Sequence, residues 1–266
     1  MVGGTGLDVA PGPRQTKMEQ RLSKVIVITG AGQGLGRALA RRFASDGEQV
    51  VVLGRTAAKI EAVAAEIGAP AMAVTCDVTS PDSVRKAFAT IAERHPKIDV
   101  LINNAAVYHP FQIQEATDKD IDEIIAANLN GPIYCVRAAV SMMERGGHII
   151  NVSSESVGMV FPHLSLYQAS KAGLERFSQS MYQELQPQGI RVTCVRAGMM
   201  MEDGKQNSFD PERAMRFAQA AYAVGLKLAE SPISNVNSIT GIFRLLIDSP
   251  PDMTVETVAL HGWRAN

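Results

Sequence analysis

The sequence predicts an α/β fold, a single Rossmann-type doubly wound parallel sheet with helices on both faces. Short β-branched runs alternate with longer stretches of helical periodicity along most of the chain. This alternation is typical of parallel strands joined by crossover helices. A glycine-rich turn follows the first run, as it does in nucleotide-binding folds of this class. The length of 266 residues suits one domain of this kind.

The predicted strands are short apolar segments, at residues 25–28, 50–53, 71–75, 98–102, 148–152, 190–195 and 254–260. Helical patterns fall between them, near residues 35–43, 57–67, 81–94, 118–144, 165–186 and 235–248. Residues 199–232 interrupt the alternation, and we expect a lid or loop excursion there. Residues 1–20 are rich in glycine and proline, which predicts a flexible leader before a catalytic domain at 21–266.

Composition and charge exclude several classes of function. Twenty-six basic residues face 27 acidic ones, so the net charge of −1 argues against a nucleic-acid partner. No apolar run approaches the roughly 18 residues of a membrane helix, and residues 1–24 lack the apolar core of a secretion signal. We therefore expect a cytoplasmic protein without membrane partners. The histidines lack metal-ligand spacing, so no metal site is expected. Buried, unreactive thiols are predicted at Cys76, Cys135 and Cys194.

The turn after the first strand fits the spacing TGxxxGxG. Its residues are Thr29, Gly30, Gly34 and Gly36. Glycines allow the backbone to turn tightly and to approach a pyrophosphate, which then lies at the N-terminus of the following helix. The simpler interpretation is a bare corner between a strand and a helix. The flanking strand and helix favour a phosphate-binding turn.

The end of the second strand indicates which dinucleotide binds. An NAD-binding protein normally has an acidic residue there, which accepts the ribose hydroxyls. This chain has Gly54 and Arg55 instead, and a guanidinium group suits a 2′-phosphate. The alternative is an arginine on a solvated loop. The sequence therefore predicts NADP as the cofactor in preference to NAD.

Tyr167 and Lys171 are four residues apart in a predicted helix, so both lie on one face. A free phenol has a pKa of about 10, and a neighbouring cation lowers that value. Such a pair suits proton transfer near neutral pH. The alternative is an amphipathic helix whose lysine stem only covers apolar surface.

Four further segments complete a set of six motifs. Asp77 follows the third strand, Asn103–Ala106 the fourth, and Asn128–Gly131 reads Asn-Leu-Asn-Gly. Ser154 stands thirteen residues before Tyr167. In order and spacing, these motifs resemble those of the short-chain dehydrogenase/reductase family.

The resemblance covers nearly all of residues 22–260 and implies a role for each catalytic residue. Tyr167 would be the general acid or base, and Ser154 would hydrogen-bond the substrate oxygen. Lys171 would lower the pKa of the tyrosine and hold the nicotinamide ribose, and Asn128 would anchor a water for proton relay. The implied cofactor contacts are Thr29, Gly30, Gln33, Gly34, Leu35, Gly36, Arg55, Asp77, Val78, Asn104, Ala105, Tyr167, Lys171, Ala197, Gly198 and Met200.

The chain departs from the family pattern in three places. Ala106 replaces the last glycine of the Asn-Asn-Ala-Gly segment. After the sixth strand the family usually has Pro-Gly and then a threonine, whereas residues 197–202 read Ala-Gly-Met-Met-Met-Glu. The last strand, at residues 255–260, lacks the usual late glycine pair. The hold on the nicotinamide end therefore differs from the family pattern.

These observations predict an NADP(H)-dependent oxidoreductase that interconverts a carbonyl compound and a secondary alcohol. The alternatives are a dehydrogenase of a small 3-hydroxy or 3-oxo acid or acyl substrate, and a catalytically silent cofactor sensor. An epimerase or dehydratase of the extended fold would need a substrate domain for which the chain has no room.

An apolar substrate is expected because of the side chains in the excursion, which include Met199, Met200, Met201, Phe209, Met215, Phe217 and Tyr222. Arg213 and Arg216 can point to solvent on a predicted helix, and their presence keeps the acid alternative open. Pairing into a homodimer or homotetramer is expected through the helices that carry Ile133, Leu174, Phe177 and Met181.

Overall fold

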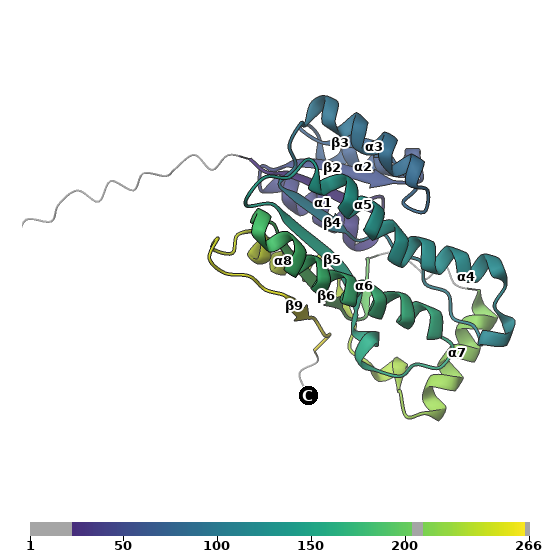
Figure 1. Cartoon of the computed structure of the whole chain (residues 1–266). Helices are drawn as coiled ribbons and strands as arrows, with labels where there is room; N and C mark the ends of the chain where they lie inside the picture. Colours follow the sequence, from purple (N-terminus) through teal and green to yellow (C-terminus); the bar gives the residue numbers. More distant parts are fainter. Residues whose placement is uncertain (1–22, 204–209, 264–266) are drawn as a thin grey trace, which may run out of the picture.

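The computed structural model describes residues 23–203 and 210–263, so the predicted leader lies outside the described residues. Seven parallel strands form one sheet in the order β3-β2-β1-β4-β5-β6-β9 (Figure 1). The strands are β1 (Val25–Thr29), β2 (Gln49–Gly54), β3 (Met72–Thr75), β4 (Val100–Asn103), β5 (His148–Ser154), β6 (Arg191–Ala197) and β9 (Thr257–Ala259). The predicted doubly wound parallel sheet is confirmed. The strand order reverses between β1 and β4, and ligands bind in such folds at the carboxyl edge beside this point.

Helices cover both faces of the sheet (Figure 1). One layer consists of α1 (Gly34–Ser45), α2 (Ala57–Ile67) and α8 (Thr240–Ile247), and the other of α3 (Pro81–Arg94), α5 (Gly131–Val140) and α6 (Ser165–Leu185). Each strand contributes side chains to the core on both faces of the sheet, because alternate side chains point to opposite faces. In β1, Ile26 and Ile28 pack with the first layer, and Val27 packs with the second. Short 3₁₀ helices occur at η1 (Ile113–Glu115), η3 (Glu155–Gly158), η4 (Gln186–Gln188) and η5 (Leu228–Glu230).

The prediction of one helix over residues 118–144 is wrong. The structure has α4 (Asp118–Ile125), then a π-helical turn at η2 (Ala126–Asn130), and then α5. Pro132 lies in the first turn of α5 and has no N–H to donate to the carbonyl of Asn128, so regular α-helical bonding is interrupted there. Single π-helical turns are common at functional sites, and this one contains Asn128.

The excursion after β6 is more ordered than a loop. It contains β7 (Met200–Met201), which pairs in parallel with β8 (Ser234–Asn235), and α7 (Pro211–Ala223) lies between them. The expected helix over 235–248 therefore begins only at Thr240, because the preceding residues pair with β7. Phe209 lies outside the described residues.

The two arginines of α7 lie at the surface, more than a third exposed, and pair with acids there. A nitrogen of Arg216 lies 2.5 Å from an oxygen of Glu115, and one of Arg213 lies 3.9 Å from Asp120. Glu115 belongs to η1 and Asp120 to α4, so the ion pairs connect α7 to the segment between β4 and α5.

The predicted burial of the three cysteines is confirmed. Burial raises the pKa of Cys76 to about 11 and that of Cys194 to about 12, so both stay protonated at neutral pH. Leu174 is fully buried within the chain and cannot belong to an exposed apolar face. Self-association through the other residues of that face stays a prediction.

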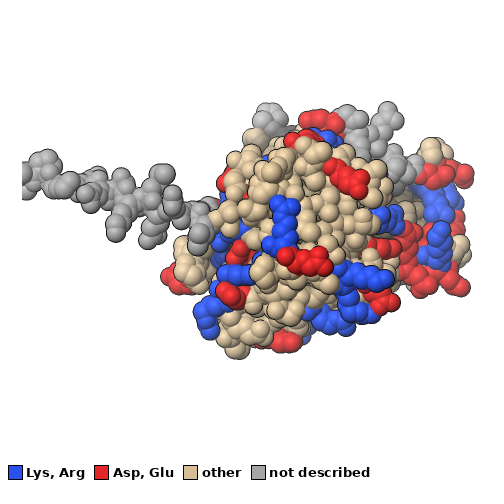
Figure 2. All heavy atoms as spheres, turned by 90° about the horizontal axis from the view of Figure 1, so that it is seen from above, with Lys and Arg blue, Asp and Glu red and all other residues tan. Residues whose placement is uncertain are grey.

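Acidic and basic side chains are interspersed over the face shown in Figure 2, with no large area of one sign. None of the helices in residues 23–203 and 210–263 has both the length and the apolar character to cross a membrane.

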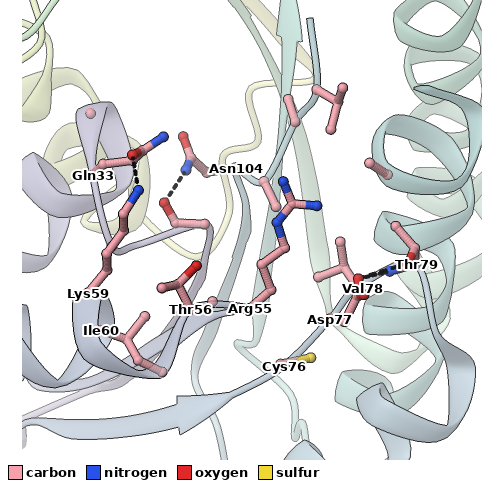
Figure 3. Close-up of a pocket in the computed structure, with 18 residues that line it drawn as sticks. Gln33, Arg55, Thr56, Lys59, Ile60, Cys76, Asp77, Val78, Thr79 and Asn104 are labelled. Carbon is pink, nitrogen blue, oxygen red and sulfur yellow. Dashed lines mark hydrogen bonds between the residues drawn. The ribbon is translucent and has the colours of Figure 1, made fainter. Parts of the chain in front are cut away.

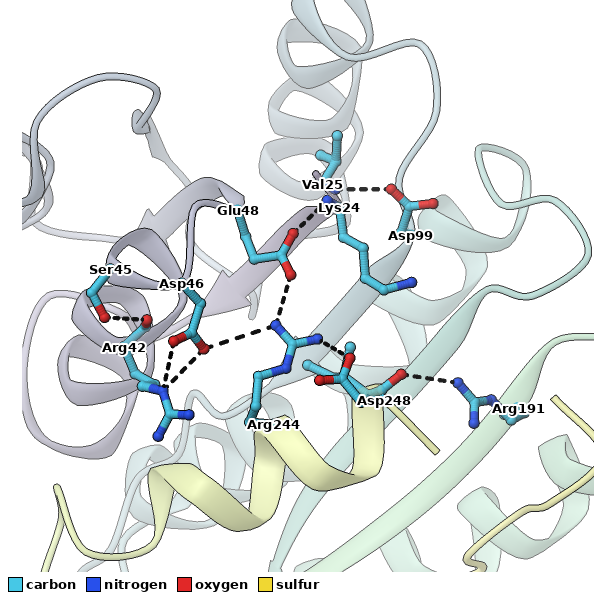
Figure 4. Close-up of polar contacts among 11 residues, drawn as sticks. Lys24, Val25, Arg42, Ser45, Asp46, Glu48, Asp99, Arg191, Arg244 and Asp248 are labelled. Atoms are coloured by element: carbon cyan, nitrogen blue, oxygen red, sulfur yellow. Dashed lines mark hydrogen bonds and ion pairs between the residues drawn. The ribbon is translucent and has the colours of Figure 1, made fainter. Parts of the chain in front are cut away.

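A buried ion-pair cluster fastens the amino edge of the sheet (Figure 4). Arg244 of α8 lies 2.7 Å from Glu48, which directly precedes β2, and 2.5 Å from Asp248. The other carboxylate oxygen of Glu48 accepts a hydrogen bond from the backbone N–H of Lys24, just before β1. Arg244 and Glu48 are both more than nine-tenths buried. The cluster thus joins α8 to the first two strands, at the edge opposite to the predicted site.

We expect Arg244→Leu to lower the free energy of unfolding by about 3 kcal/mol, because it removes the cation from a buried carboxylate. Thermal and urea unfolding measure the change. Arg176→Leu, on the exposed side of α6, is the control and should change stability by less than about 0.5 kcal/mol. Equal stability of the two variants would contradict the importance of the cluster.

Candidate active site

The structure brings Ser154, Tyr167 and Lys171 together at the carboxyl edge of β5. Ser154 ends β5, and α6 begins at Ser165, so its first turn carries Tyr167 and its second carries Lys171. The Lys171 ammonium nitrogen is 5.9 Å from the centre of the Tyr167 ring. Because α6 packs along β5 and β6, the three side chains come from elements that hold each other in place.

Lys171 is almost completely buried, with 2% of its surface exposed. Its ammonium group donates a hydrogen bond of 2.7 Å to the backbone carbonyl of Val152 in β5. Burial disfavours the charged form and lowers the pKa of Lys171 to about 8. The lysine therefore changes its protonation close to physiological pH.

The pKa of Tyr167 differs from the sequence expectation. Burial raises it above its usual value, and a hydrogen bond with Ser154 acts in the opposite direction. The Lys171 ammonium group is directed to the carbonyl of Val152 and not to the phenol oxygen, and burial is the larger influence on the tyrosine. The phenol is thus held in its protonated form, as a proton donor.

The two adjacent serines have different surroundings. The hydroxyl of Ser153 donates to a carboxylate oxygen of Glu175 at 2.8 Å, and Glu175 also pairs with Arg196 at 2.6 Å. Ser154 instead hydrogen-bonds Tyr167 and accepts from the backbone N–H of Ser156 at 3.2 Å. Ser153 therefore connects β5 to α6, and Ser154 is the serine that faces the site.

Asn128 is fully buried in the π-helical turn. Its amide oxygen accepts from the N–H of Val107 at 2.7 Å, and its amide nitrogen donates to the carbonyl of Val107 at 2.8 Å and to Ser170 at 3.1 Å. The side chain thus joins the loop after β4 to α6. This geometry gives Asn128 a positioning role, and the water relay stays a prediction.

A pocket of about 360 Å³ lies at the carboxyl edge of β1, β2 and β4 (Figure 3). Val107, one of its lining residues, is hydrogen-bonded to Asn128. Tyr167 and Lys171 are not among the described residues that line it, so their cofactor contacts stay predictions. Gly30 and Gly34 have φ of +64° and +58°, a region that favours glycine. A Cβ atom at Gly30 would lie 2.8 Å from the Cα of Ala105, so the turn can approach β4 only without a side chain. These features fit a dinucleotide.

Half of the predicted cofactor residues line this pocket, namely Gly30, Gln33, Gly34, Arg55, Asp77, Val78, Asn104 and Ala105. Three others serve the packing of the turn. The hydroxyl of Thr29 accepts from the N–H groups of Asn104 and Ala105, both at 3.0 Å, and Leu35 packs against the core. A Cβ atom at Gly36 would lie 2.6 Å from the side chain of Asn104, so this glycine lets α1 lie close to the loop after β4.

The predicted contacts after β6 lie elsewhere. Met200 packs against the core, and Gly198 lies against Glu155 and the carbonyl of Leu260. The carboxylate of Glu155 accepts from the N–H of Met199 at 3.0 Å and lies 2.7 Å from the ring of His261. Neither Met200 nor Gly198, nor the neighbouring Ala197, is among the described residues that line the pocket, so cofactor contacts there stay predictions.

Sequence reasoning did not identify Thr56, Lys59 and Val107, which also line the pocket. Thr56 and Lys59 follow the end of β2 together with Arg55 and lie around one side of the pocket (Figure 3). Lys59 donates a hydrogen bond of 3.1 Å to Gln33 across the glycine-rich turn. The available signal was a second basic residue four positions after Arg55, at the start of the following helix.

Tyr108 was also not identified, although it contacts Tyr167. Its ring lies edge-to-face with that of Tyr167, with centres 5.0 Å apart, and its centre is 6.5 Å from that of Phe217 in α7. Phe217 also lies 6.3 Å from Phe161. Aromatic rings from three segments thus gather next to Tyr167.

Only some of the apolar residues of the excursion turn toward the protein. Met201, Met215 and Tyr222 are half or more exposed, because α7 turns only one face toward the protein. Phe217 is the residue of α7 that contributes to the aromatic group.

The sequence is similar to those of known dehydrogenases and reductases. The sequence model of the short chain dehydrogenases matches residues 24–213. The chain belongs to the short-chain dehydrogenase/reductase family. A 3beta-hydroxysteroid dehydrogenase of Mediterraneibacter gnavus is 37% identical over 177 residues, which cover 65% of this chain and 64% of that enzyme. A D-xylose 1-dehydrogenase of Caulobacter vibrioides is 32% identical over 213 residues, covering 78% and 84% of the two chains.

Solved structures of this family agree with the fold. A short chain dehydrogenase from Burkholderia cenocepacia in complex with NADP superposes with a TM-score of 0.77 at 27% identity. The match covers 90% of this chain and 96% of that one. A dehydrogenase/reductase from Sinorhizobium meliloti also gives 0.77, at 28% identity, with 89% and 93% covered.

Burial of Lys171 should lower the free energy of unfolding at neutral pH. Its pKa is about 8 in the folded protein against 10.5 for an ordinary lysine, so below pH 8 folding buries a charge. The cost disappears as the pH rises from 8 to 10.5, because the unfolded chain then binds more protons. We expect Lys171→Met to raise the Tm at pH 7, and the gain over wild type to shrink at pH 9.5.

Thermal unfolding at both pH values measures this effect. Lys86→Met removes an exposed lysine of α3 and should leave the Tm nearly unchanged at both. A Lys171→Met protein less stable than wild type at pH 7 would show that the lysine stabilises the fold.

Proposed function

We propose that this protein is an NADP(H)-dependent oxidoreductase that interconverts a carbonyl compound and a secondary alcohol with a largely apolar body. The observation that carries the proposal is that Ser154, Tyr167 and Lys171 gather at the carboxyl edge of the same parallel sheet that holds a pocket fit for a dinucleotide. Membership of the short-chain dehydrogenase/reductase family supports the reaction class.

In this mechanism Tyr167 gives its phenolic proton to the substrate oxygen during reduction and takes it back during oxidation. Ser154 donates a hydrogen bond to the same oxygen and stabilises the charge that develops on it. Lys171, whose pKa of about 8 lies near ambient pH, is placed to exchange protons next to Tyr167. The nicotinamide, when bound, supplies or accepts the hydride.

The surroundings of the pocket support NADP. Arg55 and Lys59 both line it, and Gly54 offers no carboxylate for the ribose. Arg55 is two-thirds exposed and lies 3.5 Å from Glu123 of α4. A 2′-phosphate would take this guanidinium as its partner, since a phosphate accepts stronger, bidentate hydrogen bonds from arginine. The NADP complex of the Burkholderia cenocepacia relative is consistent with this choice.

The surroundings of Tyr167 support an apolar substrate. Tyr108, Phe161 and Phe217 supply aromatic surface, and such surface is typical of pockets for apolar ligands. Arg213 and Arg216 are paired with acids outside this group, so a substrate carboxylate would have to compete for them. The name of the Mediterraneibacter gnavus relative agrees with an apolar secondary alcohol, whereas the xylose dehydrogenase acts on a sugar.

Tyr167→Phe should lower kcat by at least about a hundredfold, because the transferable proton is lost, while the Kd of NADPH changes little. Steady-state kinetics with a panel of ketones and fluorescence titration of NADPH measure the two effects. Tyr182→Phe, on the same helix and packed against the core, is the control for loss of a phenol. Near-normal turnover by Tyr167→Phe would move the chemistry to another group.

Arg55→Asp should weaken NADP binding and improve NAD binding, so that the ratio of kcat/KM for the two cofactors reverses in favour of NAD. The charge change repels a 2′-phosphate and offers an acceptor to the ribose hydroxyls. Arg94→Asp, at the end of α3 that points away from the pocket, makes the same change without this effect. Equal kcat/KM for NADP and NAD in wild type would contradict the predicted preference.

A neutral ketone should be a better substrate than the same skeleton carrying a carboxylate. The comparison of kcat/KM for such a matched pair measures the difference at the transition state. A tenfold advantage for the acid, about 1.4 kcal/mol, would favour the oxo-acid alternative and contradict the apolar pocket.

A further inference from the structure

Glu202 directly follows β7 and reaches the glycine-rich turn, 168 residues earlier in the sequence. One of its carboxylate oxygens accepts a hydrogen bond of 2.8 Å from the backbone N–H of Gly34, the first residue of α1. The other lies 3.6 Å from the guanidinium group of Arg37, one turn further along α1. The carboxylate is largely shielded, since 15% of the side chain is exposed.

This position suits an anion. Gln33, the residue at the N-cap of α1, makes no capping hydrogen bond with its side chain, and the first turn contains no acidic residue. The first N–H groups of a helix lack partners within the helix, and together they carry a partial positive charge. Glu202 thus provides, from a distant segment, the negative cap that the helix itself lacks.

The same N-terminus is where the proposed cofactor would place its pyrophosphate. The glycine-rich turn, including Gly34, lines the pocket that fits a dinucleotide, and such turns bind the pyrophosphate at the helix N-terminus. A carboxylate and a pyrophosphate repel each other and cannot share one N–H group. We propose that Glu202 competes with the cofactor pyrophosphate for the N-terminus of α1, and so sets the affinity of the protein for NADP(H).

The backbone that carries Glu202 is fixed on both sides, so the side chain alone must move. Met201 pairs with Asn235 in β8, and the N–H of Val236 donates to the carbonyl of Met201 at 3.1 Å. The next residue, Asp203, accepts from the side chain of Asn235 at 2.8 Å. Rotation of the Glu202 side chain, which breaks its contacts with Gly34 and Arg37, would expose the N–H of Gly34 without unfolding of β7.

The threonine that usually follows the Pro-Gly of the family after the sixth strand is missing from residues 197–202, and Glu202 brings a carboxylate to this segment. An uncharged side chain there does not repel a pyrophosphate, whereas a carboxylate does. The affinity effect is thus a property of this chain, and it rests on the proposed dinucleotide function.

Isothermal titration calorimetry with NADP⁺ and with NADPH tests the proposal on the full chain. Glu202→Gln keeps the size and the hydrogen-bond acceptor but removes the charge, and Glu202→Thr introduces a shorter neutral side chain. Both variants should bind either cofactor about tenfold tighter than wild type, because like charges brought together in a binding site are costly. Glu212→Gln removes an exposed charge from the first turn of α7 and should leave the Kd unchanged.

Adenosine 2′-monophosphate provides a second control, because it carries the ribose phosphate but no pyrophosphate. Its Kd should be the same for wild type, Glu202→Gln and Glu202→Thr. Cofactor binding that is unchanged or weaker in both Glu202 variants overturns the proposal while the dinucleotide function stands. If wild type and both variants fail to bind any dinucleotide, the proposed function fails and this inference fails with it.

Discussion

The site depends on one constraint, which is the burial of a lysine ammonium group between β5 and α6. Lys171 gives its hydrogen bond to the carbonyl of Val152, and burial lowers its pKa to about 8. The same burial keeps Tyr167 protonated, since its pKa is raised. The pKa of Lys171 is thus lowered toward neutral pH, whereas the pKa of the neighbouring Tyr167 is raised further above it. The fold must supply the stability that this arrangement costs.

Interactions around the site hold α6 in register with the sheet. Glu175 joins Ser153 of β5 to Arg196 of β6, and the Asn128 side chain joins the loop after β4 to α6. Each of these contacts crosses between elements that are distant in sequence. Because they converge on one helix, the positions of Tyr167 and Lys171 relative to Ser154 follow from the packing of the whole carboxyl edge.

Local sequence patterns predicted the sheet, most helices and the residues that line the pocket at the glycine-rich turn. The β-branched runs and the spacing of Gly30 and Gly34 contain that information within a few residues. The failures have long-range causes. The pairing of β7 with β8, the aromatic contact of Tyr108 and the reach of Glu202 to α1 join segments whose contacts no local pattern records. The raised pKa of Tyr167 depends on burial, which spacing alone does not reveal.

The central claim is that Tyr167 exchanges a proton with the substrate oxygen, and a positive nicotinamide bound beside the phenol should then favour its ionised form. ¹³C NMR of protein labelled at tyrosine Cζ measures this, with the Tyr167 signal assigned by its absence in Tyr167→Phe. The account predicts that the tyrosine titrates at a lower pH in the presence of saturating NADP⁺ than with saturating NADPH or with no cofactor. The same titration midpoint under all three conditions would contradict it.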